Sequence, residues 1–272
     1  MKSGTTLAVA LLAAVAAAAP LRADDAPQTQ QAAPQTDAPQ TAPPTRGSIE
    51  GCDISDDLLA TDSVLQKVGD AIKADKPLDI LVIGSRSSSI PQSEGSAYPA
   101  RMQAALKEAL PHVTVNLTVE IQAKTTAEDA SSGFAKLLEA KKPTLVVWQT
   151  GTVDAMRSVD PDDFHSAVDE GVVALQNAGA DVILINPQYS PRTETMISLP
   201  PYIDNMRAVA QQHDIPLFDR FAIMHQWNDD GEFDLFSTSH GPGLAKRVHD
   251  CLGRALSKFV IDSAHLDAAQ QN

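Results

Sequence analysis

The hydrophobic positions of this chain form short unbroken runs that alternate with helix-spaced patterns. The runs predict strands at 78–83, 113–119, 144–148, 181–185 and 215–218. Apolar residues three or four positions apart predict helices over 54–74, 98–110, 127–140, 161–178, 202–213 and 247–260. Strands that are apolar throughout and alternate with helices are typical of a parallel sheet covered on both faces. We therefore expect an α/β fold, a three-layer sandwich with a mostly parallel central sheet.

In such sheets, functional sites lie beyond the carboxyl ends of the strands. The first strand runs into a Ser-rich turn, Gly84-Ser85-Arg86-Ser87-Ser88-Ser89. No Gly-rich phosphate cradle with a following Lys-Ser/Thr pair is present, so the turn does not indicate a nucleotide site. A serine nucleophile could lie here, but it would need a histidine base. A polar turn that caps the next helix fits the same residues.

The N-terminus has the pattern of a secretory signal peptide. Lys2 supplies the positive charge, 7–19 is an apolar run, and Ala23 is a small residue at the cut site. We expect a signal peptide over 1–23, and hence a periplasmic or secreted protein. An uncleaved N-terminal anchor is the alternative.

Composition divides the rest of the chain into three parts. Residues 24–47 are almost all Asp, Ala, Pro, Gln and Thr, which favours a disordered tether because such a segment buries little apolar surface. Residues 48–262 suit one domain with a sizeable core. Residues 263–272 form a polar tail.

The net charge of −14 argues against nucleic acid or an anionic membrane as a partner. No later apolar run is long enough to cross a bilayer, so we expect no transmembrane segment in the mature chain. The chain has two cysteines, Cys52 and Cys251, and an oxidising compartment favours a disulfide between them. Two free buried thiols are the alternative. Because the thiols are far apart and no histidine cluster accompanies them, we expect no metal site, and we expect no cofactor.

Several segments together resemble one known family. They are ILVIGSRSSSIPQSEGSAYPA (80–100), LVVWQTGTVD (145–154), VILINPQYSPR (182–192), LFDRFAIMHQW (217–227) and the His-Asp-Cys of 249–251. In order and spacing they resemble the SGNH/GDSL-type hydrolases, especially an exported bacterial subgroup with a Ser-rich first turn. The resemblance implies the SGNH-hydrolase fold, which is flavodoxin-like, across nearly the whole domain.

The resemblance also implies a serine nucleophile, a histidine base, and an oxyanion hole from a glycine, an asparagine and the serine N–H. If Gly84 matches the family glycine, the nucleophile position falls on Arg86. Ser87 is then the first candidate nucleophile, with Ser85 and Ser88 as alternatives, and His240 is the candidate base.

Other segments of the chain depart from the family pattern as well. Val153 occupies the asparagine position, 119–126 contains no glycine, and Ser237 occupies the aspartate position of Asp-x-x-His. Counting back from Cys251 without a gap places Gly243 on the histidine position instead.

Two functions follow from these observations. The first is an exported esterase or deacetylase that acts on acyl esters of the envelope or the extracellular space. The second is a catalytically inactive protein of the same fold with a binding or structural role in the cell envelope. A small acyl ester or a carbohydrate is the expected ligand, and in the second function Arg86 would hold an anionic or polar ligand in the cleft. The expected binding residues are Arg86, Gly151, Asp154, Gln188 and Tyr189.

Overall fold

The computed structural model describes residues 46–49, 51–236 and 241–266. The chain divides into two units, residues 1–42 and residues 43–272, and all described residues belong to the second. The expected signal peptide lies outside the described residues, as does nearly all of the expected tether.

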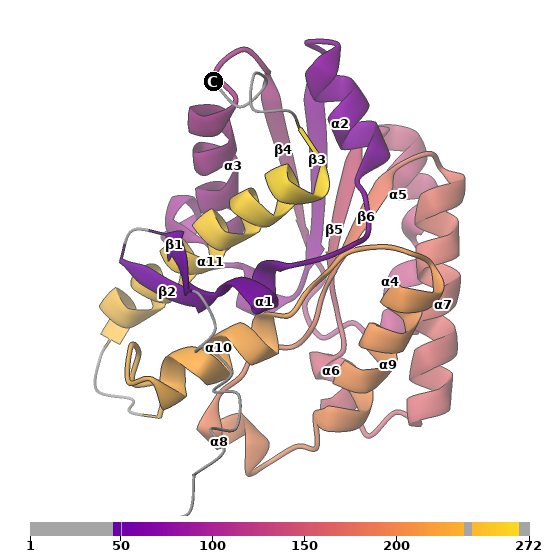
Figure 1. Cartoon of the computed structure of the whole chain (residues 1–272). Coiled ribbons are helices and arrows are strands. Elements are labelled where there is room, and N and C mark those ends of the chain that lie inside the picture. Colours follow the sequence, from indigo (N-terminus) through magenta and orange to yellow (C-terminus); the bar gives the residue numbers. More distant parts are fainter. Residues whose placement is uncertain (1–45, 50, 237–240, 267–272) are drawn as a thin grey trace, which may run out of the picture. The chain divides into compact units, whose positions relative to one another are not determined.

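A sheet of five parallel strands forms the centre of this unit (Figure 1). The strands follow the spatial order β4-β3-β5-β6-β7. They are β3 (Leu78–Gly84), β4 (Val115–Ile121), β5 (Leu145–Gln149), β6 (Asp181–Ile185) and β7 (Leu217–Phe218). This order is that of flavodoxin-like folds, and it places a topological switch point between β3 and β5. The expected α/β architecture with a parallel central sheet is confirmed.

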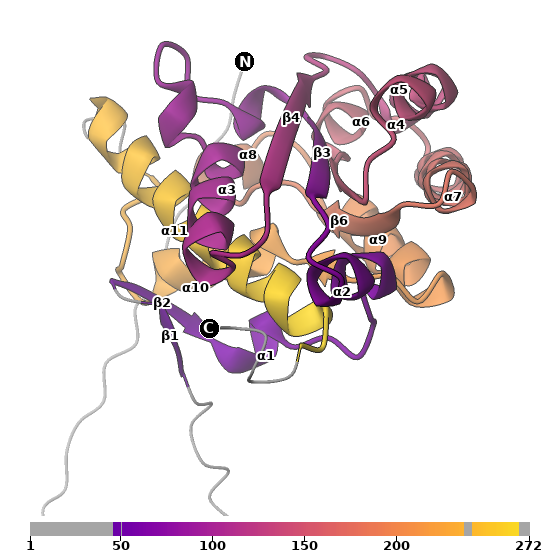
Figure 2. The same ribbon diagram turned by 90° about the horizontal axis from the view of Figure 1, so that it is seen from above.

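Helices cover both faces of the sheet (Figure 2). One face packs against α2 (Gln66–Lys73), α3 (Tyr98–Ala109), α10 (Arg220–Asp229) and α11 (Gly241–Ser263). The other packs against α4 (Ala127–Ser131), α5 (Phe134–Lys141), α7 (Pro161–Asn177) and α9 (Pro200–Gln212). Side chains of β3 alternate between the two cores, with Ile80 and Val82 in the first and Leu81 and Ile83 in the second. Strands buried on both faces explain the unbroken apolar runs.

The N-terminal part of the described chain differs from the expected helix over 54–74. Strand β1 (Arg46–Ile49) pairs antiparallel with β2 (Cys52–Ser55), and a one-turn helix α1 (Asp56–Leu59) follows. Of the expected helix, only α1 and α2 are helical, and residues 60–65 separate them. The apolar spacing misled because Ile54 is buried from a strand, not from a helix.

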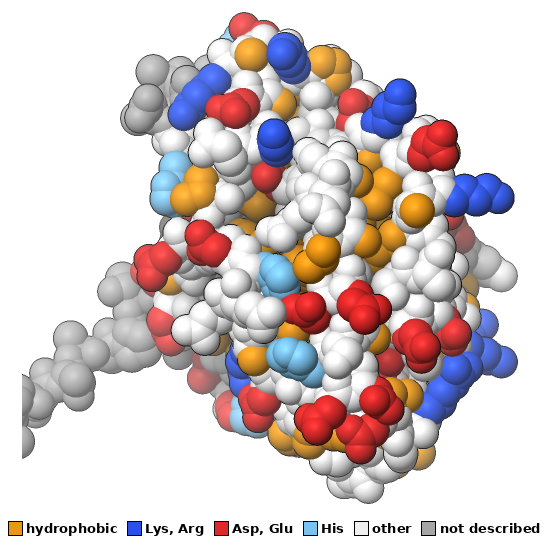
Figure 3. Space-filling model, turned by 90° about the vertical axis from the view of Figure 1, so that its right-hand side faces the viewer, with side chains coloured by type: hydrophobic (Ala, Val, Ile, Leu, Met, Phe, Trp, Pro, Cys, Tyr) orange, Lys and Arg blue, Asp and Glu red, His pale blue; other side chains and the backbone are white. Residues whose placement is uncertain are grey.

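Two further helices, α6 (Thr152–Met156) and α8 (Pro191–Glu194), are short and lie in loops at the carboxyl edge of the sheet. None of the described helices combines the length and the apolar character that a membrane span requires. Acidic side chains gather over much of the face beside α7 (Figure 3), in keeping with the net charge of −14.

Helix α11 closes the fold and packs along α3. It extends past the expected end of the domain at Asp262, and Ala264 and Leu266 beyond it are buried in the core. The N–H of Leu65 donates to the carbonyl of Ser263 at 2.8 Å, which ties the segment before α2 to the end of α11.

A disulfide joins Cys52 in β2 to Cys251 in α11, which confirms the expected pairing. The two cysteines are 199 positions apart in the sequence. The bond therefore fastens the first described hairpin to the last helix, across almost the whole length of the folded chain.

A buried histidine adds a second tie between α11 and α3. Nδ1 of His249 accepts a hydrogen bond from the N–H of Tyr98 at 3.0 Å. Burial, together with the nearby positive charge of Arg220, lowers the pKa of His249 to about 3. The ring is therefore neutral in the folded protein at physiological pH, and it serves as a packed hydrogen-bond acceptor.

Replacing both cysteines with serine will lower the free energy of unfolding by up to about 5 kcal/mol, because the unfolded chain regains the entropy of a very long loop. Urea denaturation of the oxidised protein and of the Cys52→Ser/Cys251→Ser variant measures the difference. The reduced wild type is the control and should match the variant. Coincident midpoints for the oxidised and serine forms would contradict this role.

Acid will destabilise the protein through His249. An unfolded histidine has a pKa near 6.5, above the folded value, so the unfolded chain binds the extra proton as the pH falls from about 7 toward 3. At pH 5 this proton binding lowers the free energy of unfolding by about 2 kcal/mol. His249→Asn keeps an acceptor for the Tyr98 N–H but cannot titrate. Urea denaturation at pH 7 and pH 5 should show a smaller loss in the variant, and equal losses would refute the assignment.

Candidate functional site

The turn after β3 begins at Gly84 and continues into the short 3-10 helix η1 (Arg86–Ser88). The Ser85 hydroxyl accepts the N–H of Ser87 at 3.3 Å and thereby caps η1. A Cβ atom at Gly84 would overlap the Ser88 side chain, so only glycine allows the turn to fold back over the end of the strand. The serines of this turn therefore lie at the switch point between β3 and β5.

Gln149, the last residue of β5, connects these serines. Its Nε2 donates to the Ser85 hydroxyl at 3.0 Å and to the Ser87 hydroxyl at 3.1 Å. Its Oε1 accepts a short hydrogen bond from the Ser88 hydroxyl. Gln149 is buried, so its amide is committed to this network. The crevice between β3 and β5 is thus occupied by protein hydrogen bonds.

Arg220, the first residue of α10, enters the same network from the end of β7. Its Nη1 donates to the Ser87 hydroxyl at 3.2 Å, and its Nη2 donates to Oε1 of Gln188 at 3.1 Å. Its Cζ lies 5.5 Å from the centre of the Tyr98 ring. The side chain is 1% exposed, and burial lowers its pKa to about 10, which leaves the guanidinium charged at neutral pH.

The charge of Arg220 has no carboxylate partner among the described residues, and its Nε has no hydrogen-bond partner there. A buried cation without a counter-ion is strongly unfavourable, so such groups are retained at functional sites more often than elsewhere. Sequence reasoning missed Arg220 entirely. Its position directly after the short strand β7 and Asp219 was the available signal, because sites gather at the carboxyl ends of parallel strands.

The structure separates the candidate serines. Ser87 is half-buried and is the candidate that contacts Arg220. Ser88 is 1% exposed, and its hydroxyl lies 3.0 Å from the Tyr98 hydroxyl, within the core of the site. Ser85 serves as the cap of η1. Ser85 and Ser87 are both half-buried, and contact with Arg220 distinguishes Ser87.

Arg86, on which the expected match of Gly84 would place the family's nucleophile, is exposed. Within the described part of the chain, its guanidinium makes no hydrogen bond and no ion pair. It is therefore not part of the Gln149 network, although its neighbours on both sides are.

The other expected binding residues have different roles. Gly151 adopts φ +93° at the start of α6, a conformation that favours glycine. Buried Asp154 accepts the N–H of Ala127 at 2.9 Å and so holds the start of α4; burial raises the pKa of this carboxyl. Tyr189 is buried in a ring cluster with its ring centre 4.6 Å from that of His225. Of the expected binding residues, Gln188 is the one that contacts Arg220.

The candidate base His240 and the neighbouring Ser237 lie outside the described residues. The described side chains within hydrogen-bonding distance of the Ser87 hydroxyl are Ser85, Gln149 and Arg220. None of these groups accepts a proton at neutral pH. The described part of the site thus supplies Ser87 with hydrogen-bond donors and with the neutral amide oxygen of Gln149 as an acceptor, but with no general base.

A small cavity opens at the switch point, lined by Gly84, Ser85, Gln149, Gly151 and Val153 among others. Its volume of about 10 Å³ is enough for about one water molecule. This cavity is therefore nearly filled by the side chains that line it.

Solved esterase structures share this fold. TesA is 19% identical and covers 68% of this chain and 98% of its own, with a TM-score of 0.55. A catalytic mutant of Axe2, an acetylxylan esterase from Geobacillus stearothermophilus, is 16% identical over 68% of this chain and 94% of its own, with a TM-score of 0.55. CEX, a two-domain esterase active on acetylated mannans, is 15% identical over 78% of this chain and 57% of its own, with a TM-score of 0.61. At these identities the likeness establishes the fold alone.

No curated protein matches the chain by sequence. A family model described as the Non-GDSL lipase-like family matches residues 51–266, which is nearly the whole described part. The resemblance to SGNH/GDSL-type hydrolases is thereby confirmed, and the chain belongs to the Non-GDSL lipase-like family.

Proposed function

We propose that this protein works by binding a ligand on a hydrolase fold, and that it does not hydrolyse esters through a serine nucleophile. The environment of Ser87 carries the proposal. Its hydroxyl receives N–H groups from Arg220 and Gln149, at 3.2 Å and 3.1 Å, and no described neighbour can remove its proton. A serine without a base remains a weak nucleophile.

The departures from the family pattern affect several catalytic positions, and their costs in reaction rate combine. Exposed Arg86 stands at the nucleophile position, and Val153 offers no side-chain donor at the oxyanion position. Loss of one oxyanion donor costs about 10²–10³ in rate. An enzyme that loses its nucleophile or its base keeps a rate only about 10³–10⁴ times that of the uncatalysed reaction in water. Combined, these losses would reduce any hydrolysis to a trace.

The size of the cavity at the switch point supports the same proposal. Pockets that bind small molecules typically have volumes of about 300–1,000 Å³. The cavity beside Gln149 has about 10 Å³ and holds no acyl group in this conformation. A ligand would therefore not enter this cavity, and would bind instead beside half-buried Ser87 and Gln188, which do not line it.

The proposal includes export. Residues 1–23 would be removed as a signal peptide, and 24–47 would tether the domain in the periplasm or outside the cell. The disulfide between Cys52 and Cys251 supports this location, because such bonds persist in oxidising compartments. A small carbohydrate or acyl ester of the cell envelope is the ligand class that suits this location and the polar site.

One observation favours a second function, an exported esterase or deacetylase with Ser87 as nucleophile and His240 as base. The two N–H groups donated to the Ser87 hydroxyl would stabilise an alkoxide, which favours the ionised form of the nucleophile. This function requires His240 to reach Ser87.

A fluorophosphonate probe will separate the two functions. We expect no covalent label on the folded protein and no hydrolysis of p-nitrophenyl acetate above the level of Ser87→Ala, because no described neighbour of Ser87 can act as its base. Mass spectrometry of the probe-treated protein and a colorimetric assay give the readouts. Ser89→Ala is the matched control in the same turn. A stoichiometric label that disappears in Ser87→Ala and in His240→Ala, but not in Ser89→Ala, would establish the esterase instead.

The export proposal has a direct readout. Intact-mass analysis of the protein from the envelope fraction of an expressing bacterium should give a chain that begins at Asp24 and contains the disulfide. A substitution of Ala23 by a bulky residue should retain the precursor. Recovery of a chain that still carries Lys2 in a membrane fraction would contradict cleavage and favour the anchor.

A further inference from the structure

A larger cavity, of about 400 Å³, lies beside α11 and α3, and its lining shares no residue with that of the small cavity at Gln149. Its lining includes Phe233 and the disulfide residue Cys251. The other principal lining side chains are the charged ones, Arg101, Lys246, Arg247, Asp250 and Arg254. The volume is that of an ordinary small-molecule pocket.

The charge of this cavity is opposite to that of the protein. Four lining side chains are basic and one, Asp250, is acidic. The whole chain has a net charge of −14. A concentration of positive charge in one concave region of an acidic protein produces a local field that attracts anions.

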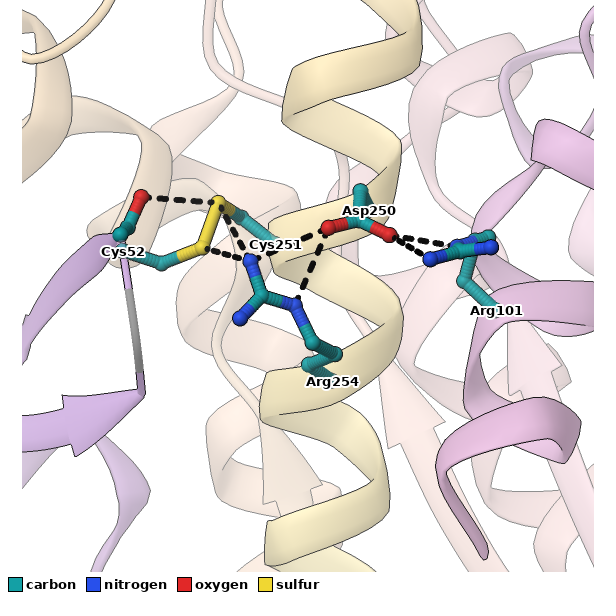
Figure 4. Close-up of polar contacts among 6 residues, drawn as sticks. Cys52, Arg101, Asp250, Cys251 and Arg254 are labelled. Atoms are coloured by element: carbon teal, nitrogen blue, oxygen red, sulfur yellow. Dashed lines mark hydrogen bonds and ion pairs between the residues drawn. A yellow bond between two sulfur atoms is a disulfide. The ribbon is translucent and has the colours of Figure 1, made fainter. Parts of the chain in front are cut away.

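Asp250 holds two of the four cations in fixed positions (Figure 4). One carboxylate oxygen binds the guanidinium of Arg101, and the other accepts Nε of Arg254 at 3.0 Å. Nη2 of Arg254 also lies 2.9 Å from Sγ of Cys52, so the guanidinium rests against the disulfide. Side chains that are already ordered lose less entropy when they bind a ligand.

The other two cations add charge that Asp250 does not neutralise. Lys246 and Arg247 are exposed on α11, and neither forms an ion pair within the described part of the chain. The Arg247 guanidinium lies 5.1 Å from the centre of the Phe233 ring, at the edge of the cavity. Both side chains are therefore available to an anionic ligand.

We propose that this cavity binds a phosphate group carried by a small molecule or a lipid headgroup. Guanidinium forks match the oxygens of phosphate in pairs, and a lysine adds a point charge. Several cations converge here on one concavity, which suits a multiply charged tetrahedral anion better than a single carboxylate. The proposal does not depend on whether Ser87 is catalytic, because the two cavities share no lining residue.

Calorimetric titration of the folded protein with inorganic pyrophosphate tests the small-molecule source. Sedimentation with phosphatidylglycerol vesicles, compared with phosphatidylcholine vesicles, tests the lipid source. The Lys246→Gln/Arg247→Gln variant removes two exposed cations and leaves the contacts of Asp250 in place. Lys73→Gln/Lys136→Gln removes the same charge from exposed positions outside the cavity.

We expect the wild type and the Lys73→Gln/Lys136→Gln control to bind one of the two probes. The pocket variant should bind that probe at least about tenfold more weakly, because charge-assisted hydrogen bonds are lost. Binding should also weaken with added salt. The proposal is overturned if neither probe binds, if the pocket variant binds as tightly as the wild type, or if the control loses as much affinity as the pocket variant.

Discussion

The arrangement of the candidate site depends on the hydrogen bonds and the charge of the buried Arg220 guanidinium. This guanidinium connects the turn after β3, through Ser87, to the loop after β6, through Gln188. Its charge also contributes to the low pKa of His249, which ties α11 to α3. Because no described carboxylate compensates this charge, the surrounding hydroxyl, amide and aromatic groups must do so. This requirement explains why so many polar side chains converge at one edge of the sheet.

The described surroundings of Ser87 differ from a catalytic triad. In a Ser-His-Asp triad, each side chain passes a proton to or orients the next. In this chain, Arg220 and Nε2 of Gln149 donate to the Ser87 hydroxyl, and Oε1 of Gln149 accepts from the hydroxyls of Ser87 and Ser88. An amide and a guanidinium can stabilise the loops as a triad does without supplying a base. The described side chains at the switch point thus form a connected hydrogen-bond network, in which Nε of Arg220 is left without a described partner.

Helix α11 connects the candidate site to the basic cavity. Its His249 faces Tyr98, while Asp250 and Cys251 face the cavity and the hairpin. Neighbouring positions on a helix point in different directions, so one element can serve both regions. The disulfide and the ion pairs of Asp250 stabilise the side of α11 that lines the cavity. Neutral His249 stabilises the side of α11 next to buried Arg220.

The sequence by itself determined the fold class, because strands buried on both faces must be apolar throughout, and this pattern needs no knowledge of neighbours. It also favoured the disulfide, since two cysteines allow one pairing, and the structure excluded the alternative of two free thiols. The break at Ser132 and Gly133 between α4 and α5, and the hairpin around Cys52, were not evident, because their spacing is also compatible with continuous helices. The Ser-rich turn was identified from sequence, and so was Ser87 within it.

Only the tertiary structure decided which residues surround Ser87. Arg220 is 133 positions away in the sequence, and it reaches the serine because β7 and β3 end at the same edge of the sheet. Burial likewise separated Ser88 from Ser87, although the two are adjacent in the chain. The four cations of the large cavity come from two helices far apart in the sequence. Residue type and spacing report local structure, whereas charge compensation and solvent exposure depend on what the fold brings together.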